Sequence, residues 1–163
     1  LASAYNDSMT VAEKLIEQTG VIGEKIEIGG FEKLEGAFIG SYVHSGKIAT
    51  IVALSAAVEG GDEAAKNVAM QVAAMNPIAL NGDGVDQAVI EKEKEIAREQ
   101  LIAEGKPADK LDGILVGKVN RFFKDNTLVA QDYIKDSSMS VEKYIDSVSK
   151  GLTVAGFKRV AIG

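Results

Sequence analysis

Apolar and polar positions alternate or recur along most of the chain in patterns that predict strands and helices. Segments 37–43 and 48–56 are rich in β-branched and aromatic residues, which predicts two neighbouring strands. Ser45 and Gly46 lie between them, and glycine readily adopts the positive φ that tight hairpin turns require. Because the second strand is apolar at nearly every position, we expect both faces of the sheet to be buried beneath helices.

The clearest helical period follows this hairpin, over residues 63–75. Apolar side chains recur there at intervals of three and four residues, at Ala65, Val68, Ala69, Val72 and Met75. Asp62 suits the N-cap position, and Pro77 ends the helix because the residue before a proline avoids helical angles. The small alanines allow this helix to approach the sheet closely.

Two weaker signals precede the hairpin. Thr10 and Glu13 have the spacing of a capping box, which predicts a helix that runs to Thr19 and stops at Gly20. Residues 25–28 alternate between charged and apolar side chains, which predicts a short strand.

The composition becomes strongly charged after a glycine-rich boundary at 81–84. Segments 85–104 and 108–124 each carry an apolar stripe, and the short link between them predicts an antiparallel helical hairpin. The first of these helices contains EKEKEIAREQ, whose polar surface favours an arm that projects from the domain. Two ion pairs are expected along its surface, Glu91 with Lys94 and Glu95 with Arg98.

The chain closes with a further helix and strand. Ser140 can cap a helix over 141–150, with Gly151 as its stop, and 152–162 is expected to form the last strand. We therefore predict an α+β fold, in which a small antiparallel sheet is covered by helices and an antiparallel helical hairpin is inserted.

Composition narrows the class of protein. The 163 residues, 46% apolar and 26% charged, are typical of one globular domain. The net charge of −6 argues against direct nucleic-acid binding, and the absence of cysteine excludes disulfides and thiolate metal sites. No apolar run approaches the roughly 20 residues of a membrane span. The chain starts at Leu1 without a signal peptide, so we expect a cytoplasmic protein and a piece of something longer.

The motifs of cofactor and metal sites are weak. The pairs Gly29-Gly30 and Gly60-Gly61 lack the spacing of a phosphate-binding loop. Asn81, Asp83 and Asp86 lie close together without a downstream calcium-loop pattern, so they are better explained as a turn. We expect no cofactor and no metal.

The only histidine, His44, falls at the predicted hairpin turn. An imidazole titrates near neutral pH and can act as a general base, but no orienting carboxylate or nucleophile is apparent in the sequence. An ordinary exposed turn residue is the competing explanation. We expect Tyr42 and His44 to alternate onto opposite faces of their strand. Without catalytic equipment, the residues favour a binding protein over an enzyme.

Two segments are distinctive, GSYVHSGKIATIVAL at 40–54 and NVAMQVAAMNP at 67–77. Together they closely resemble translation elongation factor Ts, the nucleotide-exchange factor for elongation factor Tu. The segments IGEKIEI, VIEKEKEIAREQ, EGKPAD, GKVNRFF, SMSVEKYI and VAGFKRVAIG extend the resemblance over nearly the whole chain. The arm would then be the inserted coiled coil of that family.

The resemblance implies a function and a set of contact residues. A protein of this family binds the GDP form of elongation factor Tu and loosens the nucleotide, so that GTP can replace GDP in polypeptide elongation. Ile22 and His44 match family positions that face the partner. The same turn surface would also include Ser41, Tyr42, Ser45 and Gly46.

The resemblance is incomplete. Nothing here matches the family's N-terminal three-helix domain, and the Thr-Asp-Phe-Val-Ala motif that disturbs the magnesium end of the nucleotide site is absent. We expect a fragment with reduced exchange activity. Residues 1–36 would be the tail of a preceding core subdomain, 37–82 and 126–163 the C-terminal dimerisation subdomain, and 83–125 the inserted hairpin. The alternative is a structural or self-association module without exchange activity. Such a module could form a homodimer through the core region.

Overall fold

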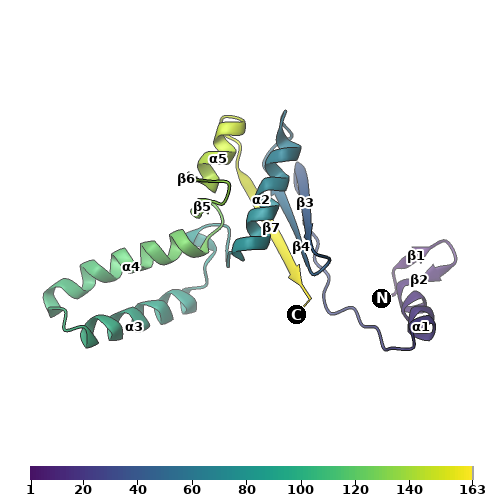
Figure 1. The fold of residues 1–163 in the computed structure, drawn as a ribbon, viewed down its shortest axis with the longest axis horizontal. Coiled ribbons are helices and arrows are strands. Elements are labelled where there is room, and N and C mark those ends of the chain that lie inside the picture. Colours follow the sequence, from purple (N-terminus) through teal and green to yellow (C-terminus); the bar gives the residue numbers. More distant parts are fainter. Residues whose placement is uncertain (163) are drawn as a thin grey trace. The chain divides into compact units, whose positions relative to one another are not determined.

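A computed structural model describes residues 1–162 (Figure 1). Gly163, the last residue of the predicted core region 126–163, lies outside the described residues. The chain forms two compact units, Leu1–Phe31 and a second unit that begins at Glu32, and each is described by itself.

The first unit consists of a small hairpin and one helix. Strands β1 (Ala4–Asn6) and β2 (Met9–Thr10) pair antiparallel and lead directly into α1 (Val11–Ile22). The predicted capping box is confirmed, because the Glu13 backbone N–H donates to Thr10 Oγ1 at 3.3 Å and the Thr10 N–H donates to Glu13 Oε2 at 2.7 Å. The β1–β2 hairpin was not predicted, since its strands are too short to show a period.

Two expectations for this unit are wrong. Helix α1 continues through Gly20 and ends at Gly23, which has a φ of 79° and donates its N–H to the Thr19 carbonyl at 2.9 Å. A glycine inside a helix costs only about 1 kcal/mol, whereas a left-handed C-cap favours glycine strongly. Residues 25–28 form no strand, because alternation alone does not supply the partner strand that a sheet requires.

A three-stranded antiparallel sheet is the framework of the second unit. Its order is β3 (Phe38–His44), β4 (Ile48–Leu54) and β7 (Val154–Ala161). The predicted hairpin is confirmed, with His44 opposite Ile48 and positive φ values of 51° at Ser45 and 66° at Gly46. The sheet therefore presents the turn with the histidine at one of its ends.

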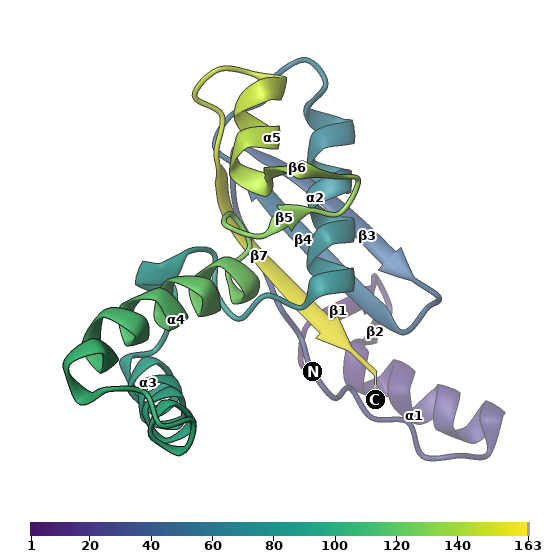
Figure 2. The same cartoon turned by 60° about the vertical axis from the view of Figure 1, so that its left-hand side comes forward.

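Helix α2 (Gly61–Met75) packs across one face of the sheet (Figure 2). Its N-cap is Gly60 and not the predicted Asp62, which lies in the first turn, where a carboxylate suits the helix dipole. The helix approaches β3 most closely at Gly40. A Cβ built there would lie 2.8 Å from the Ala65 backbone carbon and closer still to the Ala65 Cβ. The alanines of α2 thus allow the close approach that the sequence predicts.

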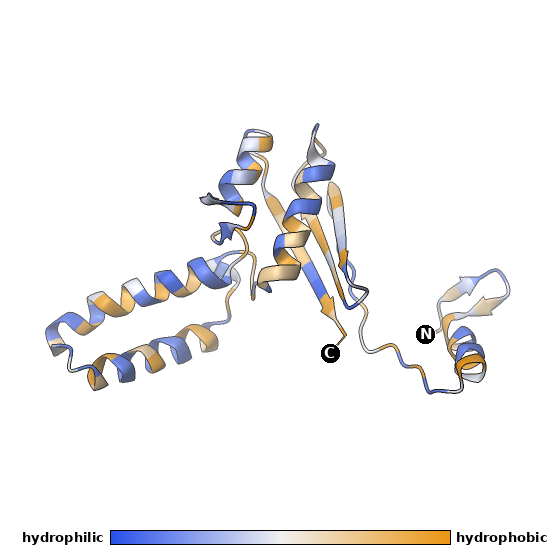
Figure 3. Ribbon diagram, in the orientation of Figure 1, coloured by the Kyte–Doolittle hydropathy of each residue, from blue (hydrophilic) through white to orange (hydrophobic). Residues whose placement is uncertain are grey.

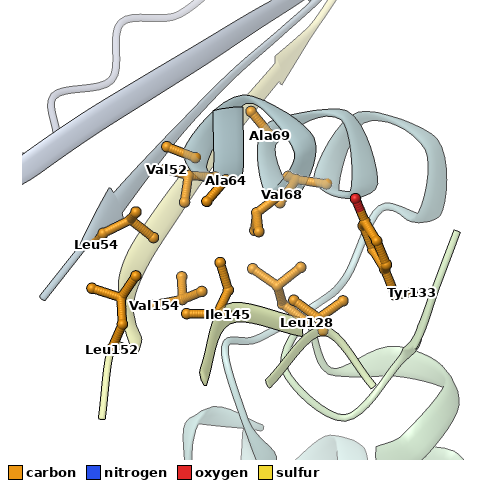
Figure 4. Packing of buried hydrophobic residues seen from close by; sticks show 13 residues of the cluster. Val52, Leu54, Ala64, Val68, Ala69, Leu128, Tyr133, Ile145, Leu152 and Val154 are labelled. Carbon is orange, nitrogen blue, oxygen red and sulfur yellow. The ribbon is translucent and has the colours of Figure 1, made fainter. Parts of the chain in front are cut away.

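Helix α5 and a second small hairpin complete the core on the same side. The hairpin is formed by β5 (Asp132–Tyr133) and β6 (Asp136–Ser140), and Ser140 caps α5 (Val141–Val148) as predicted, with the Lys143 N–H donating to Ser140 Oγ at 3.3 Å. Figure 4 shows how the side chains of the sheet, α2 and α5 meet. The core consists of Val52, Leu54, Ala64, Ala65, Val68, Ala69, Val72, Leu128, Tyr133, Val141, Ile145, Leu152 and Val154.

The expectation that helices bury both faces of the sheet is wrong. Within residues 32–162, α2 and α5 cover the same face, while Ile39 and Val43 on the opposite face are 42% and 62% exposed. The continuous apolar run of β4 led to this expectation, but on the face opposite α2 the segment before β3 covers Ala53. A Cβ built at Gly36 would lie 2.6 Å from the Ala53 Cβ, so an extended segment, not a helix, covers this position.

The predicted helical hairpin is confirmed as α3 (Gln87–Ala103) and α4 (Leu111–Asn126), with short 3-10 turns at Gly82–Gly84 and Ala108–Lys110. Figure 3 shows apolar positions scattered along both helices among polar ones, in keeping with a solvated arm. Their shared seam buries Ala97, Leu101, Leu111 and Leu115. Among residues 1–162, no helix is both long and apolar enough to span a membrane.

Charges on the arm pair in part as predicted. Lys94 Nζ lies 2.9 Å from Glu91 Oε1, which confirms the first expected ion pair. Arg98 instead reaches across the hairpin, with its Nη2 3.3 Å from Asp112 Oδ1. The second pair was predicted from spacing along one helix, and the facing helix offers Arg98 a carboxylate that this spacing does not include.

Candidate functional site

Tyr42 and His44 lie on the same face of β3, so the expectation that they alternate is wrong. Residues two apart in a strand share a face. Gly40, Tyr42 and His44 therefore all point to the side on which α2 lies, and the Gly40–Ala65 approach and the shared surface of Tyr42 and His44 agree with this. The strand brings the tyrosine to the histidine instead of separating them.

The two side chains are joined by a hydrogen bond. Tyr42 Oη lies 3.0 Å from His44 Nδ1, and the ring centroids are 6.0 Å apart with the planes tilted by 39°. The Tyr42 ring packs against the main core, whereas His44 is exposed. Packing of its ring against the core therefore anchors Tyr42, and the Tyr42 hydroxyl in turn contacts the imidazole.

A hollow of about 370 Å³ adjoins this pair. It is open to solvent and most of its lining is apolar, from the residues Tyr42, His44, Ile48, Met70, Ala73, Ala74 and Ile134. Met70 and the alanines come from α2, and Ile134 comes from the turn between β5 and β6. An apolar floor with a few polar groups at its rim is the usual form of a binding surface.

Gln71 holds the β5–β6 hairpin beside the hollow. Its side chain is wholly buried, its Nε2 donates to Gln131 Oε1 and to the Asp132 carbonyl, both at 3.1 Å, and its Oε1 accepts from the Ile134 N–H at 2.8 Å. A buried amide with these partners fixes the hairpin to α2, because each lost bond would leave a polar group unsatisfied. The position of Ile134 in the hollow depends on this network.

A second polar cluster fixes the other side of the hairpin. Tyr133 and Tyr144 stack with ring centroids 4.1 Å apart and an interplanar angle of 9°. Asn67 Nδ2 donates to Tyr144 Oη at 2.8 Å, and Lys135 Nζ donates to Asn67 Oδ1 at 2.6 Å. Burial raises the pKa of the Tyr133 hydroxyl, and its hydrogen bond with Tyr144 raises this pKa further.

The other predicted contact residues are not all gathered here. Ser45 and Gly46 form the exposed tip of the turn beside His44. Ser41 is exposed but alternates onto the opposite face of β3, away from the hollow. Ile22 ends α1 in the first unit and is 57% exposed. The structure thus brings together the tyrosine, the histidine and the tip of the turn, but not Ser41.

Sequence reasoning missed the rest of the lining. Met70 lies on the predicted helix, but its place in the lining beside Tyr42 and His44 depends on the angle at which the helix crosses the sheet. Ile134 belongs to a hairpin that was not predicted. A short Tyr-Ile-Lys-Asp segment, whose aspartate accepts from the Ser138 N–H at the start of β6, is the only local signal that could have indicated it.

The chemistry of the hollow is that of a binding surface. No carboxylate, hydroxyl nucleophile or second imidazole lines it beyond Tyr42 and His44. Residues 1–162 contain no group of three or more metal-ligating side chains, and the candidates Asn81 and Asp86 act as caps that accept from the Gly84 and Ala88 N–H groups. The arrangement offers one hydrogen-bonding imidazole above an apolar floor.

Comparison with known proteins places these residues in a family. The family model described as elongation factor TS matches residues 1–163. The chain is 65% identical to elongation factor Ts of Flavobacterium psychrophilum, over 100% of this chain and 60% of the relative. The identity is 60% with the protein of the same name from Christiangramia forsetii, over 95% and 57%, and 43% with that of Porphyromonas gingivalis, over 99% and 59%. The chain spans about 60% of the length of these relatives.

Proposed function

Since this chain belongs to the elongation factor Ts family, we propose that it binds the GDP form of elongation factor Tu and promotes the release of GDP, which GTP then replaces. The observation that carries the proposal is the match of the family over residues 1–163. The chain acts by binding and makes or breaks no covalent bond. We also propose that it acts in the cytoplasm, where polypeptide elongation takes place.

The surface around His44 is the proposed contact. Its exposed imidazole can donate or accept one directed hydrogen bond, and the adjacent hollow of about 370 Å³ can receive an apolar side chain. Interfaces gain most of their affinity from a few such anchored contacts. Ile22 and Ser41 stay predicted contacts that rest on the resemblance alone.

Exchange follows from a difference in affinity. If the chain binds nucleotide-free elongation factor Tu more tightly than the GDP form by some factor, GDP affinity falls by the same factor when the chain is bound. This reciprocity makes the proposal measurable without any catalytic group. A chain that binds both forms equally would displace no nucleotide however tightly it bound.

The rate of GDP release tests the proposal. Elongation factor Tu loaded with a fluorescent GDP analogue is mixed with excess unlabelled GDP, with and without the chain, and the loss of fluorescence is followed. We expect acceleration that saturates with the concentration of the chain. The rate should be lower than with a full-length relative, since these 163 residues lack the Thr-Asp-Phe-Val-Ala motif. A release rate that the chain leaves unchanged, despite measurable binding, would refute the exchange function.

The assignment of regions to subdomains is also a proposal. We propose a core made of 37–82 and 126–163 with the arm, 83–125, inserted between them, and the sheet and helices of the second unit support this division. The first unit ends at Phe31, and the proposed boundary for the preceding subdomain is 36.

One observation favours self-association as a second candidate function. The face of the sheet opposite α2 exposes Ile39 and Val43, 42% and 62% of whose surface is open to solvent. Exposed apolar surface of this kind often marks a protein interface. Sedimentation over a range of concentrations tests it: a sedimentation coefficient that rises with concentration supports a dimer, and a constant monomer value contradicts it.

A further inference from the structure

Tyr42 and His44 form an isolated pair at the rim of the hollow. Within residues 1–162, the hydrogen bond of the His44 side chain joins its Nδ1 to Tyr42 Oη at 3.0 Å. The other ring nitrogen, Nε2, is left for an external group. Whether Nδ1 carries the proton therefore decides whether Nε2 can accept or donate a hydrogen bond.

The chemistry of the two groups decides the direction of the bond. A neutral imidazole carries one N–H and one bare nitrogen, and the bare nitrogen is a strong acceptor. A phenolic hydroxyl is a better donor than acceptor, so Tyr42 donates its proton to a bare Nδ1. The proton of the imidazole then lies on Nε2, and the hydrogen bond at one nitrogen fixes the role of the other.

We infer that Tyr42 is a positioning residue, which holds His44 in the tautomer that presents Nε2–H outward as a hydrogen-bond donor. The group that it binds on a partner is therefore an acceptor oxygen, a backbone carbonyl or a carboxylate. The inference about the partner rests on the proposed function, but the tautomer of His44 is a property of the chain alone.

The fold supports this role by fixing the tyrosine. Tyr42 pairs with Thr50, two residue pairs before the last pair of the hairpin, and packs its ring against the core. Gly40 on the same face allows β3 to lie close against α2. A ring anchored in this way loses little freedom when its hydroxyl contacts a neighbour. A surface tyrosine without such packing would leave the imidazole free to rotate.

The first test measures the tautomer directly. The chain has one histidine, so ¹⁵N–¹H correlation of a labelled sample at alkaline pH, where imidazole is neutral, reports one ring. We expect a protonated Nε2 and a bare Nδ1. Tyr42→Phe, which keeps the ring and removes the hydroxyl, should lower the ratio of Nε2–H to Nδ1–H tautomers roughly fivefold, as expected for the loss of one hydrogen bond.

A matched control separates this effect from a general one. Tyr5→Phe removes an exposed hydroxyl in the first unit and should leave the tautomer ratio unchanged. A wild-type ring that carries its proton on Nδ1 would overturn the inference. So would a Tyr42→Phe ratio equal to that of the wild type.

The second test asks whether Tyr42 acts on a partner through His44. Binding of elongation factor Tu with GDP is measured by calorimetry for Tyr42→Phe, His44→Ala and the double variant. If Tyr42 only positions the ring, the double variant binds as His44→Ala does. Additive losses would mean that Tyr42 contacts the partner itself, and would overturn the positioning role.

Two substitutions of His44 test which nitrogen is used. Glutamine places an N–H donor near the position of Nε2, and asparagine places its polar group near Nδ1. We expect His44→Gln to retain more binding than His44→Asn, and the reverse order would overturn the outward donor. Absence of binding by the wild type would refute the proposed function, and the tautomer measurement would still decide the role of Tyr42.

Discussion

The close approach of β3 to α2 at Gly40 gives the sharpest stability prediction. An alanine there would place its Cβ 2.8 Å from the Ala65 backbone carbon, a distance that real Cβ atoms essentially never show. The obstacle is backbone as well as the Ala65 side chain, so no rotamer change relieves it. Either β3 or the whole helix has to shift.

The magnitude follows from two opposing effects. Overpacking of this kind costs about 1–3 kcal/mol. Replacing glycine by alanine restricts the unfolded chain and returns about 0.4–1 kcal/mol. Taking the middle of both ranges, we expect Gly40→Ala to lower the free energy of unfolding by about 1 kcal/mol. The shift should also weaken binding at the surface that Tyr42 and His44 form, because β3 carries both.

Urea denaturation followed by circular dichroism measures this difference. Gly61→Ala, at the start of α2, is the matched control, since the nearest atom to its added Cβ would be Val58 Cγ2 at an ordinary 3.5 Å. That variant should be as stable as the wild type or slightly more so. A Gly40→Ala protein as stable as the wild type would refute the close contact and the argument that rests on it. Partial recovery in Gly40→Ala with Ala65→Gly would identify the side-chain share of the clash.

Three further predictions concern the supporting structure. Gln71→Ala leaves the buried partners of its amide unsatisfied and should cost about 1–3 kcal/mol in urea denaturation. It should also speed amide exchange at Ile134, and unchanged exchange there would contradict the role given to Gln71. The folded state raises the pKa of Tyr133. The contribution of its protonated hydroxyl to the free energy of unfolding is therefore complete below the unfolded pKa of about 10, and it is lost as pH rises further. Thermal denaturation should therefore show a fall in stability above pH of about 10, which Tyr133→Phe reduces; equal profiles for both proteins would count against this linkage. Leu101→Ala removes a wholly buried side chain from the arm seam and should cost the arm about 2–5 kcal/mol. Amide exchange should then accelerate in α3 and α4 but not in β4, and acceleration throughout would show that arm and core unfold together.

Local signals predicted much of the fold. The signals for five features lie within a few positions of each other, in the period, the caps and the turn residues. These features are the hairpin that carries His44, the helix after it, the capped helices at Thr10 and Ser140, and the helical arm. These features are confirmed because the sequence that specifies them is contiguous.

Features that depend on distant partners were missed or misread. Residues 25–28 alternate correctly for a strand, but pairing requires a neighbour that alternation does not identify. The β4 run is apolar on both faces, yet only the packing shows that helices cover one of them. The end of β3 was misread for a different reason, since Tyr42 and His44 are two residues apart and must share a face.

Some parts of the candidate site could be predicted from the sequence and others could not. His44 and its turn could be found from the sequence, because a unique histidine beside a hairpin glycine is visible there. The floor of the hollow could not, since Met70 and Ile134 reach it from elements that are distant in the chain. The contact of Tyr42 with His44 could have been predicted, because residues two apart in a strand share a face.

The central claim is that the chain binds elongation factor Tu through the surface around His44, and calorimetry of this pair tests it most directly. We expect the wild type to bind the GDP form, and His44→Ala to raise Kd at least about fivefold, which corresponds to roughly 1 kcal/mol. Ile102→Ala, at an exposed position of α3 in the arm, should leave Kd unchanged. Binding by the wild type with the same Kd for His44→Ala would contradict the claim.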